Sequence, residues 1–249
     1  MAVKIFAEQS MKCFHTRKTE KEVSDLRTKL DDRKLPGYTR GEEIFNMVTH
    51  IVGGGFGVIV LVLCAVFSII RRDWSALAGG IIYGAAMIFL YTVSSVYHGL
   101  RPIRAKKVMQ VLDHCTIYAL ILGTYVPILL AGMRDRFPLL ALIVFLCVLT
   151  GSAVGITFTA IDFRRYRIIS YACYFVVGWC ALFAVKYIVL AFGMPFFLWL
   201  LAGGCFYTFG MVFYGLGKNK KWFHCIFHIF ILLGSIFQFV GIFKGCMLK

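Results

Sequence analysis

The sequence predicts an all-α membrane protein: a seven-transmembrane helix bundle with a cytoplasmic N-terminus and the C-terminus outside. Its 249 residues are 60% hydrophobic and 16% charged, and the mean hydropathy is +0.80. Soluble domains are typically about 45–50% apolar and about 25% charged. Apolar runs of about 20 residues are typical of helices that span a bilayer, and seven such runs occur here. Short loops join them, which favours one membrane domain.

The seven predicted spans cover residues 47–69, 75–98, 108–131, 137–158, 168–190, 195–215 and 223–243. Several of them contain glycines four residues apart, for example Gly80 and Gly84. This spacing is typical of membrane helices that pack closely. Pro127 removes a backbone donor from the third span, so we expect a kink there.

The distribution of positive charge predicts the orientation. Twenty Lys and Arg residues fall in the N-terminal segment and in the loops after the second, fourth and sixth spans, whereas seven fall on the other side. Cytoplasmic loops carry the excess of Lys and Arg. The net charge of +15 therefore indicates topology, and no nucleic-acid partner is expected. We predict a multi-pass protein of the cell membrane.

Residues 1–40 are expected to form a basic cytoplasmic tail, followed by the transmembrane domain at residues 41–249. Thr19 and Glu22 have the spacing of a helix capping box, and apolar residues recur on one helical face after them. The tail is therefore either a short amphipathic helix on the membrane surface or disordered. A Pro-Gly pair at residues 36–37 predicts a linker before the first span.

Ionisable residues inside the spans identify a candidate site. Of twelve Asp and Glu residues, only Asp113 lies within a span, whereas five of the six histidines lie in spans or at their edges. Such groups are costly in lipid and usually functional. In the predicted topology, Asp113 and four of these histidines share one depth in the inner half of the membrane. These histidines are His50, His98, His224 and His228.

His224 and His228 are four residues apart and therefore lie on one helical face. Two such imidazoles can share a metal ion, and His98 could supply the third ligand of an open tetrahedral zinc site. Asp113 would orient or deprotonate the water in the fourth position. Ser94, one turn before His98, could donate to that water or to a developing oxyanion. Interhelical hydrogen bonding of the histidines without a metal is the alternative.

The neighbouring polar residues have simpler interpretations as well. His114 lies about 100° around the helix from Asp113, so we expect it to point away from the site and not to be a ligand. His50 could face the entrance of the site, but packing at the interface is the favoured interpretation. Asp113 could instead pair with a buried His or Tyr, and Ser94 could satisfy a helix carbonyl.

Three segments resemble signature blocks of the hemolysin III family: SSVYHGL, LDHCTIYALILGTYVP and HCIFHIF. GEEIFNMVTHIVGG is similar to that family's entry into its first span, so the resemblance covers residues 40–243. The family belongs with the progestin and adipoQ receptors and, more distantly, the alkaline ceramidases. The resemblance implies a seven-helix bundle in which three histidines hold zinc beside polar partners. The matching residues are His98, His224, His228, Ser94 and Asp113.

Some relatives in this group cleave the amide bond of ceramides. We therefore expect a zinc-dependent intramembrane hydrolase of a lipid amide or ester, with a membrane lipid as its substrate in the cytoplasmic leaflet. A non-enzymatic, zinc-stabilised receptor-like or membrane-homeostasis protein is the alternative. A cytolysin or pore is disfavoured, because conduction needs polar lining through the whole bilayer and the outer half offers only Lys186 and scattered Ser and Thr.

Overall fold

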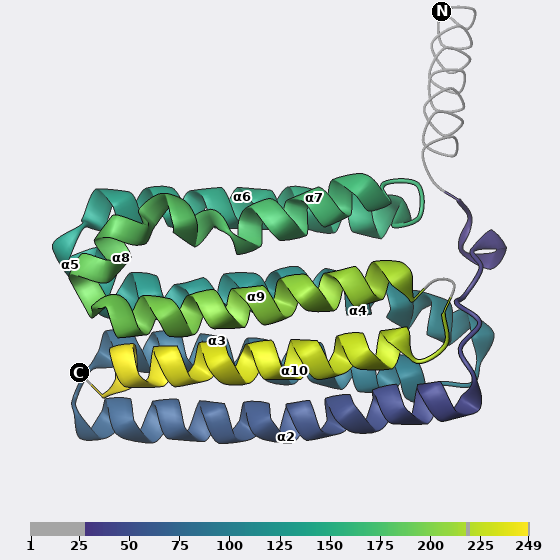
Figure 1. Ribbon diagram of the computed structural model, residues 1–249, viewed down its shortest axis with the longest axis horizontal. Helices are drawn as coiled ribbons and strands as arrows, with labels where there is room; N and C mark the ends of the chain where they lie inside the picture. The colour runs from purple at the N-terminus through teal and green to yellow at the C-terminus, as the bar shows by residue number, and fades with distance from the viewer. Residues whose placement is uncertain (1–27, 218–219, 249) are drawn as a thin grey trace, which may run out of the picture.

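The computed structural model describes residues 28–217 and 220–248, which form long helices packed side by side (Figure 1). Seven of its helices are long and apolar enough to cross a membrane, which confirms the predicted all-α bundle. The described ranges contain no strand. The helix that begins the bundle starts at the end opposite the C-terminus, as an odd number of crossings requires.

Four of the crossings are single helices, and three contain irregular turns. The single helices are α2 (Arg40–Ile70), α3 (Trp74–Gly99), α6 (Pro138–Asp162) and α9 (Met194–Leu216). The third crossing joins α4 (Ile103–Ile128), a π-helical segment (Leu129–Met133) and α5 (Arg134–Arg136). The fifth joins α7 (Arg167–Gly178), a 3₁₀ segment (Cys180–Ala184) and α8 (Val185–Phe192). The seventh joins α10 (Phe223–Ile242) to a π-helical turn (Phe243–Met247).

The first crossing begins at Arg40, earlier than the predicted residue 47, because Thr39 and Glu42 form a capping box. The Glu42 backbone N–H donates to Thr39 Oγ1 at 3.3 Å, and the Thr39 N–H donates to Glu42 Oε2 at 2.8 Å. These reciprocal bonds satisfy donors that the first helical turn leaves free. The predicted linker therefore ends at Thr39. The capping box predicted at Thr19 and Glu22 lies outside the described residues.

Small residues bring α2 and α3 into direct contact, as the glycine spacing predicts. A Cβ atom on Gly84 would lie 2.6 Å from the Leu61 Cα atom, and one on Gly80 would lie 2.6 Å from the Cys64 Cβ atom. Neither position leaves room for a side chain. The close contact holds α3, which carries His98 and Ser94, at a defined position against α2.

The fifth crossing is interrupted, although the sequence predicts one continuous helix over residues 168–190. In lipid, the backbone groups freed by such a break need partners within the protein. The Tyr125 hydroxyl supplies them, since it accepts from the Ala181 N–H at 2.8 Å and lies 3.2 Å and 3.1 Å from the Val177 and Gly178 carbonyls. The break is therefore stabilised by a side chain of α4.

Pro127 lies inside α4 as expected, and the π-helical segment begins two residues later, at Leu129. Helical irregularities of this kind absorb the backbone donor that proline lacks. Gly79 of α3 lets the proline approach, because a Cβ atom there would lie 2.6 Å from the Pro127 Cα atom. The expected irregularity of the third crossing thus takes the form of a π-helical turn.

One end of the bundle gathers the start of α2 and the α3–α4, α6–α7 and α9–α10 connections (Figure 1). We call it the basic end, because these segments and their flanking turns carry a cluster of Lys and Arg residues: Arg40, Arg101, Arg104, Lys106, Lys107, Arg164, Arg165, Arg167, Lys220 and Lys221. The excess of Lys and Arg predicts that this end is cytoplasmic. His98 at the end of α3 and His224 at the start of α10 both lie here.

The Gly84 contact predicts a stability difference between two Gly→Ala variants. Gly84→Ala should destabilise the protein by about 1–3 kcal/mol, because the new methyl group must displace the α2 backbone at Leu61. Gly55→Ala is the matched control, since a Cβ atom at Gly55 meets nothing within 4 Å. Thermal unfolding in detergent measures both, and equal melting temperatures would show that the contact is not tight.

Candidate metal centre

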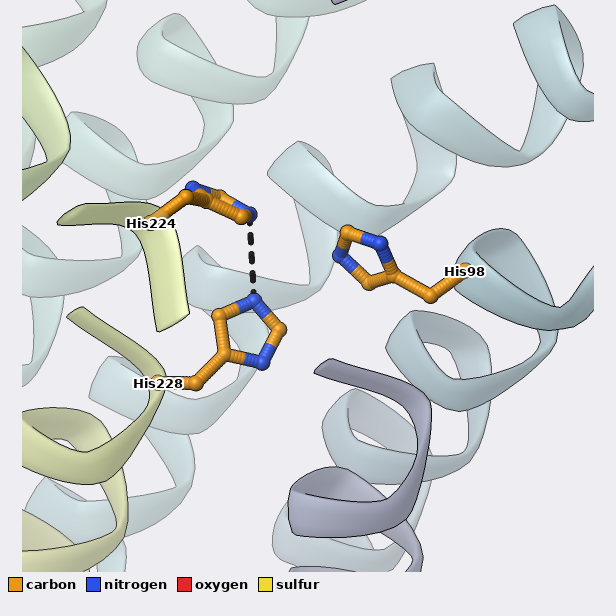
Figure 2. A group of neighbouring side chains, drawn as sticks. All are labelled: His98, His224 and His228. Atoms are coloured by element: carbon orange, nitrogen blue, oxygen red, sulfur yellow. Dashed lines mark hydrogen bonds between the residues drawn. The ribbon is translucent and has the colours of Figure 1, made fainter. Parts of the chain in front are cut away.

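Three histidines from two helices meet near the basic end. His98 comes from α3, and His224 and His228 project from successive turns of α10 (Figure 2). Their side chains are 3%, 6% and 1% exposed. Each offers one ring nitrogen, and these three atoms lie within 4.8 Å of one another. The structure therefore brings together the three predicted ligands in a buried group that could hold a metal ion.

The first turn of α10 is held in place by Glu42. Trp222, the residue before α10, has a left-handed backbone with φ 67°, a conformation unfavourable for a residue with a side chain. Its N–H donates to Glu42 Oε1 at 2.6 Å. Glu42 thus caps α2 and fixes the chain where α10 begins, two residues before His224.

The ring of His98 is oriented by a carboxylate. Its Nδ1 atom lies 2.6 Å from Glu43 Oε2, whereas its Nε2 atom is buried and has no hydrogen-bond partner in the described structure. An imidazole that donates Nδ1–H to a carboxylate presents the lone pair of Nε2. Carboxylates that orient metal-bound histidines in this way are common. The unpartnered Nε2 atom is what a metal ligand requires.

Glu43 contacts the candidate site, and the sequence analysis did not single it out. Its second oxygen pairs with Lys106 Nζ at 2.8 Å, and Lys106 also donates to the His98 and Leu100 carbonyls at 3.3 Å. The network joins α2, α3 and α4. A sequence signal was available: Glu42, Asn46 and His50 are spaced four residues apart and are buried on one face of α2. This spacing indicates that the helix begins before residue 47, within the segment that the sequence analysis assigned to a linker.

His224 and His228 approach through their Nε2 atoms, which lie 3.1 Å apart. Without a metal, one ring must donate its N–H to the other. Two nitrogens at 2.0–2.1 Å from one tetrahedral zinc ion would lie about 3.3–3.4 Å apart, close to this distance. The widest separation in the group, up to 4.8 Å, would have to shorten by roughly 1–1.5 Å. The residues present therefore fit zinc with a small adjustment of side chains.

His50 lies inside the bundle, so the expectation that it packs at the interface is wrong. It is 4% exposed and stacks on His228, with ring centroids 3.8 Å apart and an interplanar angle of 23°. Neither of its ring nitrogens has a hydrogen-bond partner among the described residues. A polar ring is costly in lipid. The His50 side chain of α2 therefore points into the bundle, where it lies directly against His228 of α10.

Asp113 and Ser94 line a cavity of about 690 Å³ that His228 and His50 also line. Ser94 is buried, and Asp113 is half-buried. The Asp113 carboxylate forms no hydrogen bond or ion pair with any described residue. The carboxylate lies close enough to His114 and Tyr38 for electrostatic interaction, so its position is compatible with the structural role considered for it as well as with the catalytic one.

Beyond these polar groups the cavity is lined mainly by apolar side chains of α4, α7, α9 and α10. Phe175, Leu182 and Val212 line it and are also 57%, 44% and 53% exposed on the outside of the bundle. The cavity therefore reaches the lipid-facing surface between the fifth crossing and α9. Its volume is within the range of about 300–1,000 Å³ of small-molecule sites.

Tyr38 covers the histidines on the side of the basic end. Its ring stacks on His224 with centroids 4.7 Å apart and lies 5.9 Å from the His98 ring. Burial, and after it the carboxylates of Glu43 and Asp113, raise the pKa of Tyr38 well above its ordinary value. The ring therefore remains a neutral phenol and separates the histidine group from the basic surface.

His114 is excluded as a ligand, as expected. Its Nδ1 atom lies 2.6 Å from the Gln110 carbonyl and its Nε2 atom 2.9 Å from the Tyr214 hydroxyl. Both nitrogens are therefore occupied by partners within the protein, and neither is free to bind a metal ion.

The chain is similar to known proteins over most of its length. A family model described as Haemolysin-III related matches residues 38–239. The chain is 34% identical over 200 residues to Hemolysin-3 of Bacillus cereus, covering 80% of this chain and 89% of that protein. It is 30% identical over 210 residues to the Hemolysin-3 homolog of Bacillus subtilis (strain 168), covering 84% and 97%. The region matched by the family model contains all three histidines of the group.

Zinc retention should depend on each histidine of the group. If the group holds zinc, the wild-type protein should purify with zinc, and His98→Ala and His228→Ala should purify without it, because two nitrogens hold zinc poorly. His114→Gln is the matched control, since it removes a buried imidazole at the same end. Elemental analysis of the purified proteins measures the zinc content. Equal zinc in all four proteins would place the metal elsewhere.

Glu43→Gln should weaken zinc binding by about 10–100-fold while leaving the fold intact, because the amide orients His98 less strongly than the carboxylate. Competition with a chromophoric chelator measures this affinity. Asp31→Asn is the control, since Asp31 lies at the same end and its side chain is 75% exposed. Identical zinc affinities for the two variants would contradict an orienting role for Glu43.

Proposed function

Because this chain belongs to the haemolysin-III related family, we propose that it is a zinc-binding protein of the cell membrane that hydrolyses an amide or ester bond of a membrane lipid. The observation that carries the proposal is the unpartnered His98 Nε2 atom, which faces His224 and His228. A cavity that begins beside this group reaches the lipid-facing surface. A lipid can therefore enter from the membrane and present its carbonyl at the histidines.

The residues that would hold zinc are His98, His224 and His228, with Glu43 fixing the His98 ring. Bound there, zinc would supply a Lewis acid that polarises a carbonyl and lowers the pKa of water from about 15.7 towards about 7.

Asp113 acts as the general base in this proposal, since it lines the cavity with His228 and its carboxylate has no described partner. It takes a proton from the attacking water as the new C–O bond forms. It then returns the proton to the leaving nitrogen or oxygen as the old bond breaks, so that a fatty acid and an amine or alcohol result. Ser94 donates a hydrogen bond to the carbonyl oxygen as negative charge develops.

The apolar part of the cavity holds the acyl chain and excludes bulk water from the reaction. The basic end lies in the cytoplasm by charge distribution, so the substrate comes from the cytoplasmic leaflet. A conducting pore is disfavoured, because the cavity walls beyond Asp113 and His228 are mainly apolar and conduction needs polar lining throughout.

A non-enzymatic role is the second candidate, and the Lys106–Glu43–His98 network favours it. These ion pairs join three helices, and a metal at the histidines would add α10 to the same assembly. Structural metal sites contribute to folding in this way. The protein would then be a zinc-stabilised receptor-like or membrane-homeostasis protein.

Asp113→Asn separates the two candidates. If the protein is a hydrolase, the variant should retain zinc and release fatty acid about 10²–10⁴-fold more slowly, because the amide cannot accept the proton. Fatty-acid release from a panel of ceramides and lipid esters by purified protein measures the rate. Ser94→Ala should reduce the same rate by less.

Unchanged turnover in Asp113→Asn would remove this residue from the mechanism. Absence of turnover with every lipid amide and ester, together with a large loss of thermal stability in chelator, would favour the structural role of zinc.

A further inference from the structure

A second cavity opens at the basic end, on the far side of Tyr38 from the histidines. Its volume is about 630 Å³. It is formed by residues 33–38 before α2, by α4, and by the α6–α7 and α9–α10 connections. It shares no lining residue with the cavity beside Asp113. It is therefore a separate site with its own chemistry.

Positive side chains from three segments converge on this cavity. They are Arg33, Lys34, Arg164, Arg167, Lys220 and Lys221. The carboxylates of Glu42 and Asp162 also line it. Formal charge alone thus leaves an excess of four positive charges.

The two carboxylates are already occupied by backbone donors. Glu42 accepts from the N–H groups of Thr39 and Trp222. Asp162 accepts from the N–H of Thr28 at 2.8 Å and from that of Arg164 at 3.0 Å. Both serve to cap and join chain segments. Neither forms an ion pair with a side chain of the cavity within the described structure.

None of these cations forms an ion pair with a carboxylate in the described structure, although Arg33 and Lys221 lie close enough to Asp162 and Glu42 for electrostatic attraction. Arg33 donates to the Ile161 carbonyl at 2.5 Å, and Lys220 lies over the Phe223 ring. The remaining four form no ion pair with any described residue: Lys34, Arg164, Arg167 and Lys221. Unpaired cations on a cytoplasmic face serve topology in many membrane proteins. Here, however, cations from separate segments converge on one open cavity, which topology does not require.

We propose that this cavity binds the phosphate group of an anionic ligand, either the headgroup of an anionic phospholipid or a free phosphate from the cytoplasm. Arginine guanidinium groups match phosphate oxygens in geometry, and basic pockets at the cytoplasmic ends of membrane helices suit anionic headgroups. Leu35, Pro36 and Phe163 add apolar wall. The volume exceeds that of a lone phosphate and is within the range of small-molecule sites.

The test measures ligand binding by purified full-length protein in detergent, by thermal shift and by native mass spectrometry. The probes are short-chain phosphatidylglycerol, inorganic phosphate and, as the electrically neutral comparison, phosphatidylcholine of the same chain length. The cavity variant is Arg164→Gln/Arg167→Gln/Lys221→Gln. The control variant is Arg40→Gln/Arg101→Gln/Arg165→Gln, which removes the same charge from residues at the same end that do not line the cavity.

We expect saturable binding of phosphatidylglycerol or phosphate by the wild-type protein, tighter than that of phosphatidylcholine. The cavity variant should weaken it by at least about tenfold, and the control variant by much less, since each nearby cation contributes on the order of 1 kcal/mol. Binding of the lipid alone identifies the headgroup as the source of phosphate. Binding of phosphate alone identifies a soluble ligand.

Equal weakening by the two variants would overturn the proposal, because it would show adsorption to a generally basic surface. Absence of binding to the wild-type protein would overturn it as well. If the triple variant is not monodisperse, Arg164→Gln/Lys221→Gln against Arg101→Gln/Arg165→Gln makes the same comparison. None of these measurements depends on lipid hydrolysis.

Discussion

The structure depends on one constraint: a polar group within the membrane must find its partner inside the protein, because lipid offers none. The interrupted fifth crossing meets it through the Tyr125 hydroxyl. The His98 ring satisfies it at Nδ1 only, which pairs with the Glu43 carboxylate. Glu43 in turn forms an ion pair with Lys106. The same rule that keeps the backbone regular thus fixes the orientation of His98 and leaves its Nε2 atom directed at His224 and His228.

The fold separates two approaches to the histidine group. On the membrane side, an apolar cavity leads from the lipid-facing surface to His228, Asp113 and Ser94. On the other side, Tyr38 stacks on His224 and closes the path towards the basic cavity. An apolar ligand and a charged ligand could therefore bind at the same time, because the two cavities share no lining residue. Glu42 links the two sides, because it lines the basic cavity and fixes Trp222 ahead of His224.

The crossings and the three-histidine group could be predicted from sequence because each has a local signal. Apolar runs identify spans, and the four-residue spacing of His224 and His228 places them on one face. Glu43 was not predicted, since it lies in a charged segment that was assigned to a linker and joins α2 through the Thr39 cap. The position of His50 was predicted wrongly, because depth in the membrane does not tell which way a ring faces. The cavities and the break at the fifth crossing depend on contacts between distant segments, for which sequence spacing carries no signal.

Charge balance is the strongest argument that the histidine group is built for a cation. Buried polar groups left without a hydrogen bond each cost about 1–3 kcal/mol, yet the Nε2 atom of His98 and both nitrogens of His50 have no described partner. The half-buried Asp113 carboxylate lines the same cavity as His228. A divalent cation would use the His98 nitrogen and would add positive charge between the carboxylates of Glu43 and Asp113. Hydrogen bonding among the histidines alone would leave the Nε2 atom of His98 without a partner, so it explains less of the arrangement.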